Sequence, residues 1–345
     1  MTRVAVLGAS GYTGGELLRL LLAHPGVEVV QATSDQFAGK RLEYPHPNLR
    51  GMSALRFVPH DALEPCELLV SCMPQGGLLQ RWARVRELAG RVVDLSADFR
   101  LDPADHERWY KKHPRPADVP RFVYALPEWT AQELPEARYV AVPGCMAHAS
   151  LLGILPLVRA GLVKPELVVD AKTGSSGGGA TPDRSSHHPE RASALRCYRA
   201  VGHRHTGEIE NVIERLTQTR PSVHFSATAV PSVRGILATV HAFASRPIDE
   251  NEPLRAIATA YREKPFVRLI RPNTSASPFP EPGPLQGTNY CDLAVDVDME
   301  RGRIVVNVAI DNLVKGAAGT AVHAINLMLG RPETEGLGFR GLHPI

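Results

Sequence analysis

The sequence lacks several features that would mark whole classes of protein. It has no apolar run long enough to cross a membrane, and the most apolar stretch, ASLLGILPLVRAGLV from residue 149, is interrupted by Pro156 and Arg159. The first eleven residues carry one arginine and an apolar run too short for a signal-peptide core. No internal repeat is visible. From these absences we expect a cytoplasmic protein without a membrane partner.

Strong charge and paired cysteines are also missing. The net charge is only +3, with 39 basic and 36 acidic residues, which gives no indication of binding to nucleic acid. The number of cysteines is odd, their spacing is wide and no CxxC occurs, which argues against a disulfide framework or a zinc ribbon. A reducing compartment fits best. The five cysteines are Cys66, Cys72, Cys145, Cys197 and Cys291.

The length of 345 residues exceeds what one hydrophobic core usually serves, so the sequence predicts two domains. Up to about residue 145, short apolar runs alternate with helical patterns. Strands that are apolar on both faces belong in a parallel sheet covered by helices. We therefore expect an α/β domain of the doubly wound, Rossmann type over 1–145. The expected strands lie at 3–7, 27–33, 68–73, 92–96 and 139–142, with a helix at 14–24.

After residue 145 the pattern changes. One helix is followed by longer strands with period-2 alternation, which is typical of a mixed or antiparallel sheet with one polar face. Residues 146–312 are therefore expected to form an α+β domain, and segment 313–345, with a helix near 315–329, to complete the first domain. The expected strands lie at 223–231, 235–245, 291–299 and 303–312. The stretches 173–191 and 271–287, rich in Gly, Pro and Ser, are expected to be the least ordered.

A glycine-rich turn follows the first expected strand. In VAVLGASGYTGGELL, the residues Gly8, Gly11 and Gly14 stand three apart between a strand and a helix. Glycines let the backbone approach a pyrophosphate, and the N–H groups and dipole of the helix supply positive potential there. Such a pattern is often only a turn. With a strand before it and a helix after it, this one predicts a dinucleotide site.

The end of the second expected strand bears on the identity of the cofactor. Proteins that bind NAD usually place an acidic residue there to hold the ribose 2′-hydroxyl. This segment offers Ser34, with Lys40 and Arg41 nearby, which suits a 2′-phosphate, but Asp35 is also present. The residues favour NADP and leave NAD as the alternative.

Cys145 is the candidate nucleophile. It follows a Pro-Gly turn and falls at or just before the first turn of the expected helix MAHASLLGILPLVRAG. A helix N-terminus stabilises a thiolate, and such positions lower a cysteine pKa from ~8.5 into the range ~3.5–7.5. The alternative is a core cysteine that acts only as a small hydrophobic residue. The other four cysteines lie in ordinary contexts, and for them we prefer that second interpretation.

A nucleophilic cysteine needs a partner for proton transfer. The segment VGHRHTGEIENVIERL supplies His203, His205 and Glu208 where a loop or strand meets an expected helix. Thr206 resembles an N-cap and Glu208 falls in the first turn, so His205 is expected at a fixed helix start. The alternative is a solvated basic cluster without a catalytic role.

Several segments together resemble a known family. The stretches GASGYTGGELLRLL, DLSADFRL, VPGCMAHAS, GHRHTGEIE, VPSVRGILATVHA and IDNLVKGAAGTAVHAINLMLG are similar to the N-acetyl-γ-glutamyl-phosphate reductases of arginine biosynthesis, relatives of aspartate-semialdehyde dehydrogenase. The segment SSHHPERASALRCYRAVGHRH resembles the sister branch, which makes lysine from α-aminoadipate bound to an amino-group carrier protein. Met146 and Ala147 stand where the arginine branch usually has Tyr-Pro, so the lysine branch is favoured and the acetylglutamyl phosphate is the alternative substrate.

The resemblance implies roles for individual residues. Cys145 would be the nucleophile and His205 the acid/base, with His203 the second choice. The residues implied for the cofactor, NADP, are Gly8, Ser10, Gly11, Tyr12, Thr13, Gly14, Ser34 and Asn312. Those implied for the substrate are Arg100, Ser175, His187, His188 and Arg191.

The resemblance also implies a reaction. A cysteine thiolate attacks an acyl phosphate, phosphate leaves, and hydride from NADPH converts the resulting thioester into a semialdehyde. The basic stretch that includes Arg191 and Arg196 could receive a carboxylate-rich substrate or an acidic carrier protein, or it could be a solvated surface loop. Family members are typically dimers or tetramers, so a homo-oligomer is expected.

Two other classes of function stay open. A nucleotide-sensing regulatory protein would keep the dinucleotide fold without chemistry, and Cys145 would then react like an ordinary thiol. A zinc hydrolase would use the histidine-rich segment. The spacing there matches no familiar zinc pattern, so we expect no metal. The residues concerned are His187, His188, Cys197, His203 and His205.

Overall fold

The computed structural model describes residues 1–271 and 277–344. The chain divides into two compact units, and each is described by itself. The first consists of Met1–Gly144 and Ala317–Gly338, and the second of Cys145–Gly316 and Phe339–Ile345. Cys145 therefore opens the second unit, one residue before the expected boundary.

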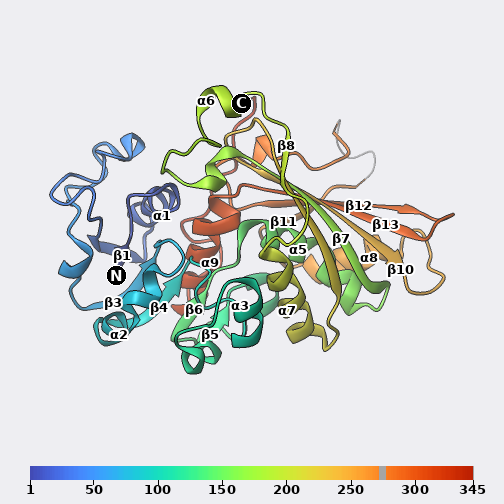
Figure 1. Ribbon diagram of the computed structural model, residues 1–345, viewed down its shortest axis with the longest axis horizontal. Helices are drawn as coiled ribbons and strands as arrows, with labels where there is room; N and C mark the ends of the chain where they lie inside the picture. Colours follow the sequence, from blue (N-terminus) through green and yellow to red (C-terminus); the bar gives the residue numbers. More distant parts are fainter. Residues whose placement is uncertain (272–276, 345) are drawn as a thin grey trace. The chain divides into compact units, whose positions relative to one another are not determined.

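The first unit contains a six-stranded sheet in which every pair of neighbouring strands is parallel (Figure 1). The expected doubly wound sheet is confirmed. One strand, β5, was not expected, because three residues do not stand out as an apolar run. The strands are β1 (Thr2–Leu7), β2 (Val27–Ala32), β3 (Cys66–Ser71), β4 (Ala89–Asp94), β5 (Phe122–Tyr124) and β6 (Tyr139–Ala141), in the spatial order β2-β1-β3-β4-β6-β5.

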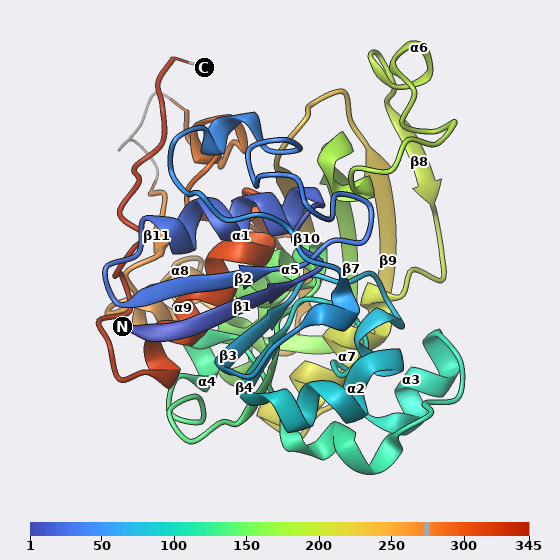
Figure 2. The same cartoon turned by 90° about the vertical axis from the view of Figure 1, so that its left-hand side faces the viewer.

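Helices cover both faces of this sheet. The connection from β1 to β2 runs across the sheet in the direction opposite to that from β3 to β4. Right-handed crossovers therefore place helices α1 and α2 on opposite faces, as Figure 2 shows. Helix α9 packs beside α1, and the segment Ala317–Gly338 that contains it belongs to the first unit. The ends of the expected segment 313–345, up to Gly316 and from Phe339, belong to the second unit instead. The helices are α1 (Tyr12–Leu22), α2 (Gly77–Leu88), α3 (Pro103–Trp109), α4 (Pro127–Thr130) and α9 (Gly319–Met328).

The second unit contains a seven-stranded mixed sheet, which confirms the expected α+β class. Its central strands show the predicted alternation, with every second residue of β10 buried along most of its length. Strand β8 forms one edge. The strands are β7 (Val163–Thr173), β8 (Arg196–Arg199), β9 (Ser222–Ala229), β10 (Ile236–Ala244), β11 (Val267–Leu269), β12 (Cys291–Asp298) and β13 (Arg303–Ile310), in the order β11-β12-β13-β10-β7-β9-β8.

The longest strand, β7, was not predicted, because Pro165 stands near its start. Pro165 cannot donate a ladder hydrogen bond, so a proline usually argues against a central strand. Here the pairing with β9 begins only at Glu166, and the pairing with β10 is irregular between Ala242 and Ala244. The proline is therefore tolerated before the regular ladder begins.

Helix α5 (Cys145–Arg159) is the central helix of the second unit. Nearly all its residues are buried, and it contacts strands β7, β10 and β13 and helices α7 (His205–Thr217) and α8 (Glu252–Tyr261). Pro156 lies inside it and has no N–H to donate to the carbonyl of Leu152, four residues earlier. The hydroxyl of Tyr261 donates to that carbonyl instead, at 2.6 Å. A proline that would otherwise leave a buried acceptor unsatisfied is thus compensated by α8.

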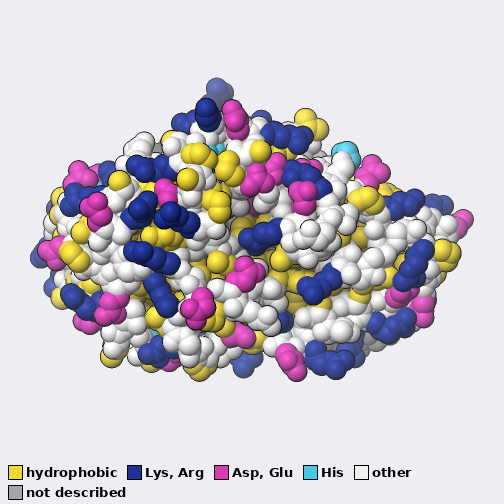
Figure 3. All heavy atoms as spheres, turned by 90° about the horizontal axis from the view of Figure 1, so that it is seen from below, with side chains coloured by type: hydrophobic (Ala, Val, Ile, Leu, Met, Phe, Trp, Pro, Cys, Tyr) yellow, Lys and Arg dark blue, Asp and Glu magenta, His cyan; other side chains and the backbone are white. Residues whose placement is uncertain are grey.

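Two findings concern the surface of the molecule. Within the described residues, no helix combines the length and apolar character that a membrane crossing requires. The face drawn in Figure 3 carries lysines and arginines interspersed with acidic side chains. This distribution fits the small net charge of the sequence.

Candidate active site

The glycine-rich turn joins β1 to α1 at the carboxyl end of the sheet, where the strand order reverses between β1 and β3. Gly8 has a φ of +76°, and a Cβ there would lie 2.7 Å from the sulfur of Met73, which follows β3. A Cβ on Gly14 would lie 2.6 Å from the backbone of Ala9, so only glycine allows this close packing. A Cβ on Gly11 would meet nothing within 4 Å. The turn thus leaves open space at the glycine where a pyrophosphate would approach the backbone.

The turn is held by a histidine that sequence reasoning missed. The Nε2 of His46 lies 2.9 Å from the carbonyl oxygen of Ala9, and a Cβ on Gly15 would meet the same imidazole. Burial lowers the pKa of His46, so the ring is neutral at pH 7 and its Nε2–H donates to the carbonyl. His46 comes from a loop 37 residues away, and nothing in its local sequence indicates this contact.

The end of β2 places Ser34 against the same turn, since its hydroxyl donates to Ser10 Oγ at 2.9 Å. The neighbouring acid has another partner. The carboxylate of Asp35 accepts the backbone N–H of His60 at 2.8 Å, and its second oxygen lies 3.8 Å from His60 Nε2. The acidic residue in the position typical of NAD-binding proteins is therefore bound to a neighbouring loop.

Arg100 lies in the loop after β4. Its Nε donates to the carbonyl of Val142 at 2.7 Å and its Nη2 to that of Leu95 at 2.8 Å, so the side chain ties this loop to the end of β6. Asp98, two residues earlier, accepts backbone N–H groups at the start of α2. Burial and the charge of Asp98 raise the pKa of Asp94 to about 6. The loop is thus organised by buried polar contacts.

Cys145 is the first residue of α5 and is partly buried. Tyr198 on β8 lies close enough for charge to act between them: burial, followed by the negative charge of Cys145, raises the pKa of Tyr198 to about 12. Arg204, Arg191 and Arg199 act on Tyr198 in the opposite direction. A cysteine at a helix start, a tyrosine and three positive charges therefore share this part of the second unit. Tyr198 was not predicted, because an aromatic residue in an exposed strand carries no signal of chemistry.

The side chains of His203 and His205 lie against each other. Their ring centroids are 4.6 Å apart, and His203 also stacks on Phe225 at 5.0 Å. The Nδ1 of His203 accepts the backbone N–H of His205 at 3.1 Å. Burial and the charges of Arg204 and Arg199 lower the pKa of His203 to about 4. His203 is therefore neutral near pH 7 and serves as an acceptor that fixes the start of α7.

One detail of this helix start differs from the prediction. Helix α7 begins at His205, and Arg204 occupies the N-cap position without a side-chain bond. The expectation that Thr206 is the N-cap was wrong, because Thr206 already has helical backbone; the acceptor that the first turn needs comes from His203. Glu208 lies in the first turn as expected and is buried.

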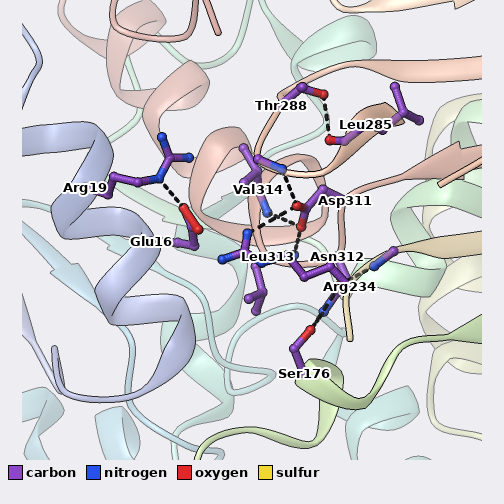
Figure 4. Close-up of polar contacts among 12 residues, drawn as sticks. Glu16, Arg19, Ser176, Arg234, Leu285, Thr288, Asp311, Asn312, Leu313 and Val314 are labelled. Atoms are coloured by element: carbon purple, nitrogen blue, oxygen red, sulfur yellow. Dashed lines mark hydrogen bonds and ion pairs between the residues drawn. The ribbon is translucent and has the colours of Figure 1, made fainter. Parts of the chain in front are cut away.

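The glycine loop after β7 is more regular than expected. Ser175–Gly178 forms a 3-10 turn, and the backbone N–H groups of Ser175 and Ser176 donate to Ser232 and Val233. The side chain of Asn312 fixes it: Nδ2 donates to Ser176 Oγ at 3.0 Å, and Oδ1 accepts the N–H of Gly235 at 2.8 Å (Figure 4). Asn312 thus secures the loop that contains Ser175. In the second stretch expected to be poorly ordered, residues 272–276 lie outside the described residues, and Gly283–Leu285 forms a 3-10 turn.

The basic stretch forms an exposed edge of the second unit. The short helix α6 (His188–Arg191) lies near the edge strand β8 (Figure 2). His187 and His188 lie at its start, and both are exposed. Arg191 folds back and donates to the carbonyl of Thr173 at 3.2 Å. Leu195 and Val201, in the same stretch, are 75% and 81% exposed. Among the described residues no group of three or more His, Cys, Asp or Glu side chains could hold a metal ion.

Comparisons with known proteins cover both units. A family model described as the semialdehyde dehydrogenase NAD-binding domain matches residues 3–137, and one described as the semialdehyde dehydrogenase dimerisation domain matches residues 145–312.

Relatives match over nearly the whole chain. A protein of Thermomicrobium roseum named LysW-L-2-aminoadipate 6-phosphate reductase is 50% identical, with 99% of both chains covered. A protein of the same name from Deinococcus radiodurans is 41% identical, covering 99% of this chain and 98% of its own. A LysW-L-2-aminoadipate/LysW-L-glutamate phosphate reductase of Saccharolobus solfataricus is 42% identical, with the same coverage.

Solved structures share the fold. Aspartate semialdehyde dehydrogenase II of Vibrio cholerae is 17% identical with a TM-score of 0.74, and covers 96% of this chain and 98% of its own. The Candida albicans aspartate semialdehyde dehydrogenase with NADP is 15% identical with a TM-score of 0.69 and the same coverage. At such identity the likeness supports the fold.

The neutral state of His203 predicts a pH dependence of stability. Its pKa is about 4 in the folded chain and near 6.5 when unfolded, so between these values the unfolded chain binds more protons. The free energy of unfolding should therefore decrease as the pH falls from about 6.5 to 4. His203→Asn keeps an acceptor and cannot be protonated. Between pH 7 and 4.5 this variant should lose less stability than the parent, by about 2–3 kcal/mol.

Urea unfolding at the two pH values measures the difference. His187→Asn, at an exposed position, is the control and should behave like the parent. Equal pH dependence in His203→Asn and the parent would contradict a neutral His203.

Proposed function

Because this chain belongs to the semialdehyde dehydrogenase family, we propose that it reduces an acyl phosphate to a semialdehyde with a nicotinamide cofactor and releases inorganic phosphate. The observation that carries this proposal is the environment of Cys145. A cysteine at the start of a buried helix, within range of a tyrosine on which three arginine charges act, is suited to act as a thiolate nucleophile.

The proposed substrate is L-2-aminoadipyl 6-phosphate linked to the amino-group carrier protein LysW, as in lysine biosynthesis. Full-length relatives at 41–50% identity carry that name. The exposed stretch around α6 and β8 supports it, since arginines interspersed with exposed Leu195 and Val201 suit an acidic protein surface. N-acetyl-γ-glutamyl phosphate of arginine biosynthesis is the alternative substrate. His187, His188 and Arg191 are proposed to contact the carrier or the substrate.

The proposed cofactor is NADP. The open space at Gly11, together with the backbone N–H groups at the start of α1, fits a pyrophosphate. Ser34 and the basic residues Lys40 and Arg41 are proposed to receive the 2′-phosphate, because Asp35 is bound to His60. When bound, the reduced nicotinamide supplies hydride to the substrate carbon. The other residues proposed to hold the cofactor are Gly8, Ser10, Tyr12, Thr13, Gly14 and Asn312.

The chain's own residues account for the bonds that form and break. The Cys145 thiolate attacks the carbonyl carbon of the acyl phosphate, a C–S bond forms, and the C–O bond to phosphate breaks. After reduction at that carbon, the C–S bond breaks, the aldehyde is released and Cys145 leaves as the thiolate. His205 is proposed to donate and accept the protons, because His203 is held neutral as a hydrogen-bond acceptor.

Further roles follow from the same proposal. Arg100 and Ser175 are proposed to contact the phosphate and carboxylate groups of the substrate. The first unit, expected over 1–145, would bind the cofactor, and the second, expected over 146–312, would carry the nucleophile and join copies of the chain into a dimer or tetramer. The proposed compartment is the cytoplasm, where thiols stay reduced.

Replacing the nucleophile tests the reaction. Cys145→Ser should bind NADP within about twofold of the parent, but its phosphate-dependent oxidation of the semialdehyde should fall by about 10⁴-fold or more. His205→Asn should lower kcat by ~10²–10⁴-fold, since it removes acid/base assistance and leaves the covalent route. Absorbance of NADPH at 340 nm follows both reactions. Normal turnover by Cys145→Ser would refute the proposed mechanism.

The contact between Asp35 and His60 predicts how cofactor preference responds to mutation. Asp35→Asn should leave the ratio of kcat/KM for NADP to that for NAD within about threefold, because this carboxylate is bound to His60. Arg41→Ala should lower the ratio about tenfold, the effect of a lost charge-assisted hydrogen bond of ~1.5 kcal/mol. A large gain for NADP in Asp35→Asn would place Asp35 at the ribose and contradict the assignment.

If the substrate is linked to an acidic carrier protein, its KM should depend on the positive charges of the basic stretch. The parent should favour carrier-linked aminoadipyl phosphate over free N-acetylglutamyl phosphate, and its KM for the former should rise with salt. Arg196→Glu should raise that KM about tenfold with little change in kcat. Arg301→Glu, at the exposed turn between β12 and β13, should change neither value. Preference for the free substrate would favour the arginine branch.

A further inference from the structure

The turn that follows β13 lies directly against the nucleophile. Val314–Ala318 forms a short π-helix, in which the N–H of Gly316 donates to the carbonyl of Asp311 at 2.8 Å. A Cβ placed on Gly316 would lie 2.7 Å from Cβ and 3.3 Å from Cα of Cys145, and 3.3 Å from the carbonyl oxygen of Asp311. Atoms at 2.7 Å collide, and both atoms of Cys145 belong to the start of a buried helix that cannot easily move.

The π-helix is itself held firmly. Asp311 is fully buried, and one carboxylate oxygen accepts the backbone N–H groups of Leu313 and Val314 at 2.7 and 3.2 Å. The other accepts the N–H of Gly287 at 2.6 Å and Arg234 Nη1 at 3.2 Å (Figure 4). Four donors from three segments therefore fix the turn. It cannot withdraw from α5 without breaking bonds to a buried carboxylate.

A glycine at this position needs an explanation. The φ of Gly316 is not positive, so its backbone does not require glycine. Within a helical segment, alanine is otherwise favoured over glycine by backbone entropy. The remaining reason for glycine is the contact with Cys145. Short π-helical turns inside helices also occur often at functional sites.

We propose that Gly316, held in place by Asp311, is a positioning residue that sets where the sulfur of Cys145 lies. A side chain at 316 would push the first residue of α5 away and change both the direction of Sγ and its distance from the helix N-terminus. Displacement of a reacting atom by about 1 Å can lower a rate by about 10²-fold. This inference deepens the proposed function, because it concerns the nucleophile of that reaction.

The experiment compares Gly316→Ala with the parent and with Gly338→Ala, an exposed glycine where a Cβ meets nothing within 4 Å. In Gly316→Ala, kcat should fall about 10²-fold while the KM for NADP stays within about twofold. The pH at which the rate of iodoacetamide labelling of Cys145 is half-maximal should also shift. Gly338→Ala should match the parent in all three. A folded Gly316→Ala protein with parental kcat and labelling profile would overturn the proposal.

A double variant keeps the proposal testable if Gly316→Ala folds poorly. Cys145→Gly removes the Cβ that the new methyl group would meet. Gly316→Ala should lower the melting temperature of the parent by about 3–8 °C, and by less than half as much in the Cys145→Gly background. Simple additivity of the two shifts would overturn the proposal. If the parent protein shows no turnover, the proposed function is refuted. The labelling and melting experiments would still decide the role of Gly316, because neither depends on turnover.

Discussion

The close packing of helix α5 against its surroundings is the constraint on which the second unit depends. Its residues are buried on almost every side, so the helix can move only if several neighbours move with it. A Cβ on Gly153 would meet Val308 of β13 at 2.7 Å, and one on Gly316 would meet Cys145 at the same distance. Tyr261 supplies the donor that Pro156 lacks. The position of Cys145 is thus determined by contacts along the whole helix.

Buried polar groups have a consistent role in both units. His46 and His203 are neutral, and each makes a hydrogen bond to a neighbouring backbone group, in one case as donor and in the other as acceptor. Asp311 accepts backbone N–H groups of the turn after β13, and Asp98 accepts those at the start of α2. Such groups are costly to bury without partners, and with partners they specify one backbone arrangement. They fix the loops from which the proposed catalytic and cofactor-binding residues extend.

Local sequence was enough to predict the elements that have strong patterns. The apolar strands of the first sheet, the alternating strands β9, β10, β12 and β13, and the helix that begins at Cys145 all follow from periodicity and turn residues. Strand β7 was missed because Pro165 masked its pattern, and its pairing with β9 and β10 is a contact between distant segments. The Thr206 N-cap was wrong because the ring of His203, two residues before His205, supplies the acceptor, a local bond that follows no common capping pattern.

The sequence by itself determined the two-unit α/β and α+β organisation, the glycine turn, the helix that begins at Cys145 and the family to which the chain is similar. These depend on residues close together in the chain, whose steric and hydrogen-bonding preferences act locally. Only the tertiary structure decided that the charge of Cys145 acts on Tyr198, that His203 is neutral, that Asp35 is bound to His60 and that Gly316 packs against the nucleophile. Each of these depends on burial or on contacts between separate segments, which no local pattern encodes.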